Sequence, residues 1–160
     1  MSKLTHIDKG GRAHMVDVSK KSETQREAIA RGCVMMKKET LKLVLSHTNE
    51  KGDPIAVAEL AGIMAAKRTS DFIPLCHPLP LTKVSVHIVP STDQPALLIS
   101  SSVKTTAKTG VEMEALMAVS TACLTLYDML KAVDKGMVIT QIELVQKTGG
   151  KSDDYYKANQ

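Results

Sequence analysis

Aromatic side chains are nearly absent from this 160-residue chain, which has no Trp, one Phe and three Tyr. Proteins that bind single-stranded nucleic acids usually stack the bases on aromatic rings, so this lack argues against a nucleic-acid partner. The formal net charge of +4 suits a phosphorylated small molecule as easily as it suits nucleic acid. Without aromatic rings, the core must be built from Val, Ile, Leu, Ala and nine Met, which makes it adaptable.

Cysteine pairs and long apolar runs are also missing. Cys33, Cys76 and Cys123 are odd in number and widely spaced, a pattern typical of reduced thiols and not of a structural zinc site. No apolar run approaches the roughly 20 residues of a membrane helix, and the first residues do not resemble a signal peptide. We therefore predict no metal site, no membrane partner and a cytoplasmic protein.

The length predicts one domain. Residues 1–25 are polar and broken by Gly10 and Gly11, which indicates an irregular N-terminal arm. Residues 26–150 then form a single α+β domain, and residues 151–160 form a polar C-terminal tail.

The hydrophobic pattern predicts the elements of that domain. Residues 28–37 fit a strand and a helix alike, whereas 38–46 have the periodicity of a short amphipathic helix. Prolines at 74, 78 and 80 predict a rigid extended segment. A hairpin is predicted next, with strands at 82–89 and 96–104. A long helix follows at 109–135, and a last strand at 137–147.

A second helix is predicted to begin at Asp53-Pro54, because Asp caps free amides and Pro fits the first helical position. It should run to about Thr69 and carry Lys67 and Arg68 in its last turn, where the helix dipole favours cations.

This order of elements predicts a ferredoxin-like α+β two-layer sandwich, with helices on one face of an antiparallel sheet. The open face of the sheet would carry apolar residues too. Oligomerisation would cover such a face.

Cys76 and His77 lie between two prolines that fix their direction. His77 fits a satisfied histidine in a bend as well as a ligand contact. Cys76 fits a small buried side chain, or a nucleophile if neighbouring cations stabilise its thiolate.

Glu112 and Glu114 are two residues apart and point in different directions on a helix, so they are not a paired carboxylate. Thr109 and Glu112 have the spacing of a capping box, in which Glu112 accepts from the Thr109 amide. Glu114 has no such role, and its carboxylate can take two parallel hydrogen bonds from the edge of a guanine ring.

Asp128 and Lys131 lie on one helix face at i and i+3. They fit a surface ion pair, worth only tenths of a kcal/mol. They also fit acid/base chemistry by a Lys131 whose pKa is lowered by burial or cations and which Asp128 orients. Lys51 fits a solvated loop or a second catalytic cation, and the segment 147–151 fits a polar terminus or a phosphate cradle.

At these motifs the chain resembles the cyclic pyranopterin monophosphate synthases, the C proteins of molybdenum cofactor biosynthesis. The most specific matches are Leu75-Cys76-His77-Pro78 and residues 108–114. The resemblance is nearly full length, and further matching segments are 4–7, 14–19, 62–84, 127–135 and 147–152.

The resemblance implies a lyase that converts 3′,8-cyclised dihydro-GTP to cyclic pyranopterin monophosphate by general acid/base catalysis, with release of pyrophosphate. It implies that Asp128, Lys131 and Lys51 are catalytic. Lys67 and Arg68 are not implied by the resemblance, but we expect them to contact the triphosphate because of their charge and position. The other implied substrate contacts are Leu75, Cys76, His77, Glu112, Met113 and Glu114.

The resemblance also implies no resident cofactor, with Mg²⁺ beside the leaving pyrophosphate left open, and a homohexamer built as a trimer of dimers. Its pocket would lie where subunits meet, which agrees with Glu114 and Asp128 being about 21 Å apart on one continuous helix. The alternative is a non-catalytic oligomeric module that binds nucleotides or RNA, in which both carboxylates would be dispensable.

Overall fold

The computed structural model describes residues 5–46, 53–151 and 153–158. Within them, five strands form one antiparallel sheet in the order β2-β3-β1-β4-β5. The strands are β1 (Thr24–Met35), β2 (Leu81–Pro90), β3 (Ala96–Ala107), β4 (Val138–Thr148) and β5 (Tyr155–Tyr156). The helices are α1 (Lys38–Leu45), α2 (Pro54–Ala66), α3 (Thr69–Phe72) and α4 (Glu112–Leu130).

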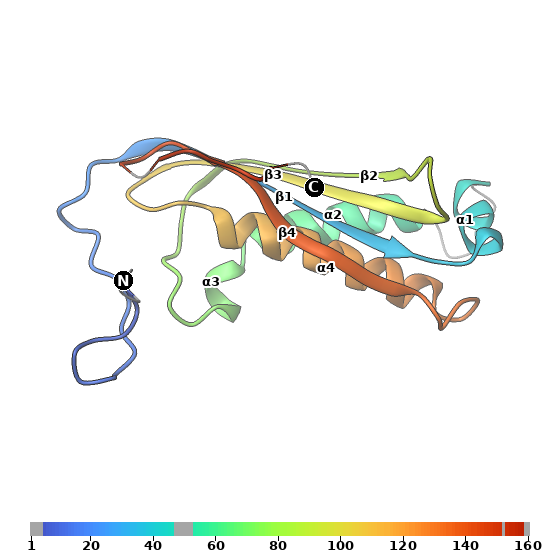
Figure 1. The fold of residues 1–160 in the computed structure, drawn as a ribbon, viewed down its shortest axis with the longest axis horizontal. Helices are drawn as coiled ribbons and strands as arrows, with labels where there is room; N and C mark the ends of the chain where they lie inside the picture. The colour runs from blue at the N-terminus through green and yellow to red at the C-terminus, as the bar shows by residue number, and fades with distance from the viewer. Residues whose placement is uncertain (1–4, 47–52, 152, 159–160) are drawn as a thin grey trace.

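Helices α2 and α4 cover one face of the sheet, and α1 lies at the end of β1 (Figure 1). This arrangement confirms the predicted two-layer α+β sandwich, with β1 between β3 and β4 as in a ferredoxin-like fold. Residues 28–35, which fitted both a strand and a helix, are strand and pair with β3 and β4.

The core lies between the sheet and the two long helices, and small residues let the layers approach closely. A Cβ at Gly32 of β1 would lie 2.6 Å from a methyl of Val119, and one at Gly62 of α2 would lie 2.7 Å from the carbonyl oxygen of Ala118. Both contacts are too short, so α4 needs glycine on each side. By length and composition α4 could cross a membrane, but here its buried residues pack on the sheet and α2.

The open face of the sheet carries both polar and apolar residues, as the sequence predicts. In one row across the strands, His87, Ser100, Arg31 and Glu143 are neighbours, and Arg31 pairs with Glu143 at 2.5 Å. The apolar residues of this face include two exposed cross-strand pairs, Val89 with Leu98 and Met35 with Val138.

Helix α2 begins as predicted, with the Asp53 carboxylate accepting from the amides of Ile55 at 2.9 Å and Ala56 at 3.2 Å. It ends at Ala66, three residues before the predicted end. The reason is local, because the Thr69 hydroxyl donates to the carbonyls of Ala65 and Ala66 and starts a separate short helix, α3. Lys67 and Arg68 therefore follow α2 and do not lie in its last turn.

Helix α4 is shorter than predicted, and the capping box is wrong. The helix has no side-chain cap at its start, and the Glu112 carboxylate instead lies 3.0 Å from Nζ of Lys147 on β4. The end of β4 thus supplies a cation that attracts the carboxylate away from the local amide. Within the predicted C-terminal tail, Tyr155 and Tyr156 add a short strand, β5, to β4.

Glu59 of α2 ties the helical layer to β2. Its carboxylate accepts a hydrogen bond from the amide of Ile88 at 3.0 Å.

Candidate active site

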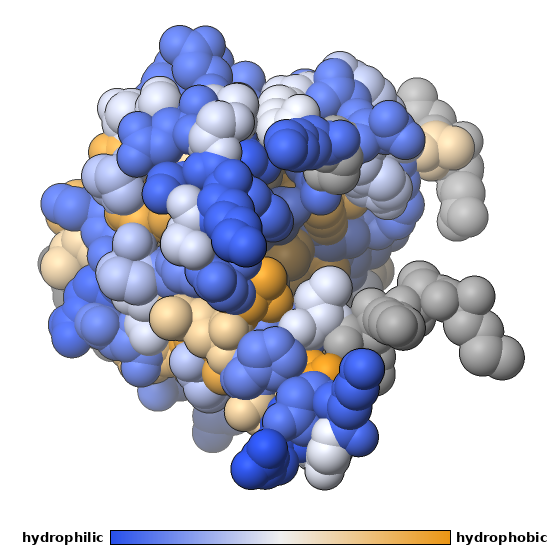
Figure 2. Space-filling view, turned by 90° about the vertical axis from the view of Figure 1, so that its left-hand side faces the viewer, coloured by the Kyte–Doolittle hydropathy of each residue, from blue (hydrophilic) through white to orange (hydrophobic). Residues whose placement is uncertain are grey.

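A hollow of about 820 Å³ opens where the N-terminal arm, the proline segment and the start of α4 meet. Figure 2 faces this end of the molecule and shows apolar surface in a depression between hydrophilic residues. From the arm, the lining residues are Thr5, His6, Ala13, Val16, Val18 and Lys21. From the other two segments they include Ile73, Pro74, Leu79, Thr109 and Gly110.

The hollow gathers one whole group of predicted site residues. All six substrate contacts implied by the resemblance line it, although they come from two segments about 35 residues apart. They are Leu75, Cys76, His77, Glu112, Met113 and Glu114. Their proximity is therefore a finding, while their roles stay predictions.

Glu114 is the most perturbed acid of this hollow. Its residue is only 4% exposed, and burial, together with the charge of nearby Glu112, raises the pKa of Glu114 to about 7. A group with this pKa exchanges its proton near neutral pH. In its ionised form it can accept two hydrogen bonds from an N–H edge that enters the hollow.

Cys76 is poorly suited to be a nucleophile. Burial raises the pKa of the Cys76 thiol, and the carboxylates of Glu114 and Glu112 raise it further. The neighbouring charges thus oppose the thiolate. This result favours the interpretation of Cys76 as a small side chain that shapes the hollow, although it is only half-buried.

A smaller hollow of about 280 Å³ adjoins the first and is basic. Lys21 lines both hollows, and the smaller one adds Arg26 and Lys151 with Ser22 and Thr24. The hydroxyl oxygen of Thr24 is buried and has no hydrogen-bond partner among the residues that the structure describes. Three cations and an unused hydroxyl are suited to phosphate oxygens.

Arg26 is held in place by its surroundings. Its Nε donates to the carbonyl of Ala107 at 2.9 Å, and Nη2 donates to that of Lys108 at 3.2 Å. Gly149 and Gly150 have φ values of 89° and 94°, and a Cβ at Gly150 would lie 2.2 Å from the Arg26 guanidinium. The two glycines are therefore required for β4 to end beside this arginine.

Sequence reasoning missed Lys21 and Arg26. The arm has no periodicity, and its position depends on long-range contacts such as that of Lys108, whose Nζ donates to the carbonyl of Ser19 at 3.1 Å. The available signals were the cations at 20 and 21 and the family match of the preceding segment, residues 14–19.

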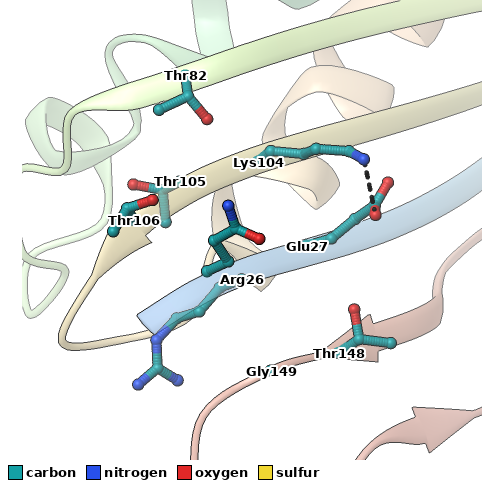
Figure 3. A pocket seen from close by; sticks show the side chains of 9 residues that line it. Arg26, Glu27, Thr82, Lys104, Thr105, Thr106, Thr148 and Gly149 are labelled. Carbon is teal, nitrogen blue, oxygen red and sulfur yellow. Dashed lines mark ion pairs between the residues drawn. The ribbon is translucent and has the colours of Figure 1, made fainter. Parts of the chain in front are cut away.

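A third hollow, of about 500 Å³, lies over the sheet beside Arg26 (Figure 3). Within it Lys104 and Glu27 point toward one another at 3.1 Å, and Arg26 points away from them. Ser102 also donates to Glu27, at 2.8 Å. Because these charges already satisfy one another, this hollow is a weaker candidate for an anionic ligand than the first two.

Asp128 and Lys131 lie near the opposite end of α4 from Glu114. They form an ion pair of 2.6 Å with side chains 71% and 56% exposed, respectively. A hydrogen bond with Asp128 and its negative charge raise the pKa of Lys131. Of the two interpretations from the sequence, the exposed ion pair is the one that the single chain shows, because Lys131 lies in solvent and next to an anion rather than in a cationic, buried site.

The structure therefore does not bring all predicted catalytic and binding residues together in one chain. Glu114 and Asp128 belong to the continuous helix α4, about 21 Å apart along its axis. Lys67 and Arg68 do not line the hollows described above, and Arg68 pairs with Asp71 at 3.0 Å. Lys51 lies outside the described residues.

Metal ligation finds no support in the parts of the chain that the structure describes. They contain no group of three or more His, Cys, Asp or Glu side chains that could hold an ion.

Comparison with known proteins identifies the family. The model of the MoaC family matches residues 15–150. The chain belongs to the MoaC family. Among its relatives, a cyclic pyranopterin monophosphate synthase of Cereibacter sphaeroides strain KD131 is 61% identical over 152 residues, which covers 95% of this chain and 96% of the relative.

Two further relatives carry the same name. The cyclic pyranopterin monophosphate synthase of Dinoroseobacter shibae is 60% identical over 152 residues, covering 95% of this chain and 96% of that protein. The one from Heliobacterium modesticaldum is 59% identical over 157 residues, covering 98% and 99%. This MoaC chain is thus similar to these enzymes over nearly its whole length.

Proposed function

We propose that this MoaC family member is a cyclic pyranopterin monophosphate synthase and acts in molybdenum cofactor biosynthesis. The observation that carries the proposal is its identity of about 60% to enzymes of that name over nearly the full length of both chains. The substrate would be the 3′,8-cyclised dihydro form of GTP. The products would be cyclic pyranopterin monophosphate and pyrophosphate.

The two adjoining hollows support a nucleotide-derived substrate. The larger one has a mainly apolar lining with the buried carboxyl group of Glu114, which suits a flat ring with an N–H edge. The smaller one presents Lys21, Arg26 and Lys151, which suits a triphosphate. We therefore propose these three cations as phosphate contacts, in addition to the predicted Lys67 and Arg68.

General acid/base catalysis as a lyase is the mechanism that we propose. Lys131 is the proton donor, because a raised pKa keeps its ammonium protonated at neutral pH. Asp128 holds that ammonium at 2.6 Å and so directs it. Cations at the phosphates stabilise the charge that develops as pyrophosphate leaves. Lys51 remains a predicted second catalytic lysine.

We propose that the enzyme is a homo-oligomer, a hexamer arranged as a trimer of dimers, with the pocket shared between subunits. The separation of Glu114 from Asp128 supports this, because one small substrate cannot contact both on one chain. The apolar side chains of Val57, Leu60 and Met64 on one side of α2 are exposed and suit subunit contacts.

The proposal also covers the compartment, the partners and the cofactors of the enzyme. The enzyme would act in the cytoplasm, without nucleic acid or membrane, and would need no resident cofactor. Mg²⁺ would enter, if at all, with the substrate's phosphates.

The deciding experiment supplies the purified protein with the cyclised GTP intermediate and measures both pyrophosphate and the pterin product. We expect both to appear in equal amounts, and neither to appear from unmodified GTP. A folded oligomer that binds the intermediate but releases no pyrophosphate would overturn the proposal in favour of a binding module.

A further inference from the structure

Asp134 is an acid that the proposed mechanism does not use, and it is one of the most deeply buried charged residues, at 1% exposed. It lies in the turn that follows α4. One of its carboxylate oxygens accepts from the amide of Lys37 at 2.9 Å and from the hydroxyl of Thr40 at 3.1 Å. The other accepts from the amide of Gly136 at 3.0 Å. Both oxygens are therefore engaged.

These bonds join two segments that are far apart in the sequence. Helix α1 begins after Lys37, whose side chain cannot accept a hydrogen bond, and it has no local side-chain cap. Asp134, 97 positions further along, supplies the missing acceptor at the helix start. The Lys37 amide also lowers the pKa of Asp134, so the group is ionised at neutral pH.

The turn after α4 is held at several other points. The amides of Val133 and Asp134 both donate to the carbonyl of Leu130 at 3.0 Å, and the Tyr127 hydroxyl donates to that of Lys135 at 3.1 Å. This turn begins at Lys131, whose own amide donates to Tyr127 at 2.9 Å. The backbone of Lys131 therefore depends on how firmly the turn is fixed.

We propose that Asp134 is a positioning residue for Lys131, anchoring the turn after α4 to the start of α1. The inference rests on the proposed function of Lys131 as proton donor. Asp134 acts through the backbone and does not touch the substrate. Because Lys131 has a long and exposed side chain, its placement relies on the backbone and on Asp128 alone among the contacts described, and a shift of about 1 Å can cost a reaction about 100-fold.

The first test compares Asp134→Asn with the matched control Val44→Ala. The Asn variant keeps the shape but points an N–H group at one of the three donors. Val44 is buried in α1 and takes no part in the three hydrogen bonds of Asp134, so its truncation destabilises the same helix and leaves those bonds in place. Well below both melting temperatures, we expect Asp134→Asn to lower kcat at least about tenfold with KM within about threefold. Val44→Ala should keep kcat within about twofold.

The second test needs no activity. Competitive acetylation followed by mass spectrometry compares Lys131 with the reference Lys83, because only the neutral amine reacts. The Asp128 pair suppresses the reaction of Lys131, so loosening the turn in Asp134→Asn should increase its relative labelling several-fold. Val44→Ala should leave the labelling unchanged.

The outcomes separate this inference from the proposed function. If Asp134→Asn behaves like Val44→Ala in both tests, Asp134 is only structural and the inference is wrong. If labelling responds but the wild-type protein has no turnover, the proposed function fails and the positioning of Lys131 stands. Should Asp134→Asn not fold, Thr40→Val removes one of the three bonds and must produce the same changes at smaller size, or the inference falls.

Discussion

The two ends of α4 offer opposite environments for ionisable groups. At its start Glu114 is buried beside an apolar hollow, and its pKa is raised to about 7. At its end Asp128 and Lys131 form an exposed pair, in which the lysine holds its proton more firmly than usual. The first end is suited to recognising a ring, and the second presents a protonated ammonium to solvent. Residues on one helix therefore need not belong to one site, and under the proposed function the two ends, about 21 Å apart along the helix axis, would serve one substrate across two subunits.

The largest effect is expected at the exposed end. Replacing Lys131 by Ala should lower turnover by about 10²–10⁴-fold, the range of a lost general acid. The free energy of unfolding should change by no more than about 0.5 kcal/mol, because the pair lies in solvent. Steady-state kinetics and urea denaturation measure the two quantities.

Lys131→Arg is the control for charge, since it keeps the cation but does not readily give up a proton. It should also lose turnover. A folded Lys131→Ala protein that keeps more than about a tenth of wild-type turnover would contradict an essential proton-transfer role.

The second effect tests whether the two ends of α4 serve different pockets. Glu114→Ala and Asp128→Ala should each be inactive alone. After random subunit exchange in equal amounts, half of the dimers are mixed, and each mixed dimer has one intact pocket, so roughly a quarter of wild-type activity should return. If mass spectrometry verifies exchange and no activity returns, the pocket is not shared in this way.

A third effect concerns recognition at the buried end. Glu114→Gln replaces one acceptor oxygen by a donor, so binding of the substrate or an unreactive analogue should weaken by about 1–3 kcal/mol. Glu112→Gln is the matched control, since Glu112 is half-exposed and pairs with Lys147, and it should cost less. Calorimetry that gives equal affinities for wild type and Glu114→Gln would remove Glu114 from the site.

The same experiment has a pH signature. The ionised Glu114 accepts the N–H groups, so wild-type affinity should fall as the pH drops below about 7, where this carboxylate takes up a proton. The slope should approach about tenfold per pH unit and should be absent from Glu114→Gln. A wild-type affinity that is flat between pH 5 and 8 would disprove the linkage.

The smallest effect is on stability. Since the pKa of Glu114 is raised from 4.5 to about 7 on folding, ionisation opposes the folded state, and stability is lost as the pH rises through this window. The neutral Glu114→Gln should therefore be more stable than wild type at pH 8, by on the order of 2 kcal/mol, and the gain should vanish below pH 4.5. Denaturation at one fixed protein concentration measures this, and equal stabilities at pH 8 would place Glu114 in contact with solvent or a cation.

Much of the fold follows from local sequence signals. Asp53 capped α2 as predicted, and the hairpin and the last strand came from alternation and turn residues. The strand β1 could not be separated from a helix, because Cys33 and Val34 are both buried and blur the alternation. Only its pairing with β3 and β4, which depends on residues far along the chain, decides the case.

The candidate site divides in the same way. The contiguous motifs 75–77 and 112–114 could be recognised from the sequence, but their proximity in one hollow depends on long-range packing and is visible only in the structure. The roles of Lys21, Arg26 and Asp134 could not be predicted, because each depends on partners many tens of residues away in the sequence. The sequence also left two interpretations of Lys131 open, an exposed ion pair or a lysine with a lowered pKa, because exposure is a property of the folded chain.

The bond from the Ile88 amide to Glu59 has a consequence for how copies of this chain can meet. Strand β2 lies at one border of the sheet, where free amides invite another strand to add, and here a carboxylate already occupies one of them. At the other border, β5 pairs only with Gln146 and Lys147, so the outer edge of β4 from Val138 to Leu144 pairs with no further strand among the described residues. Strand addition is thus opposed at β2, whereas this part of β4 is open to it. In the proposed oligomer, a neighbouring subunit would meet this chain through the open part of β4, the helices, the loops or the broad faces.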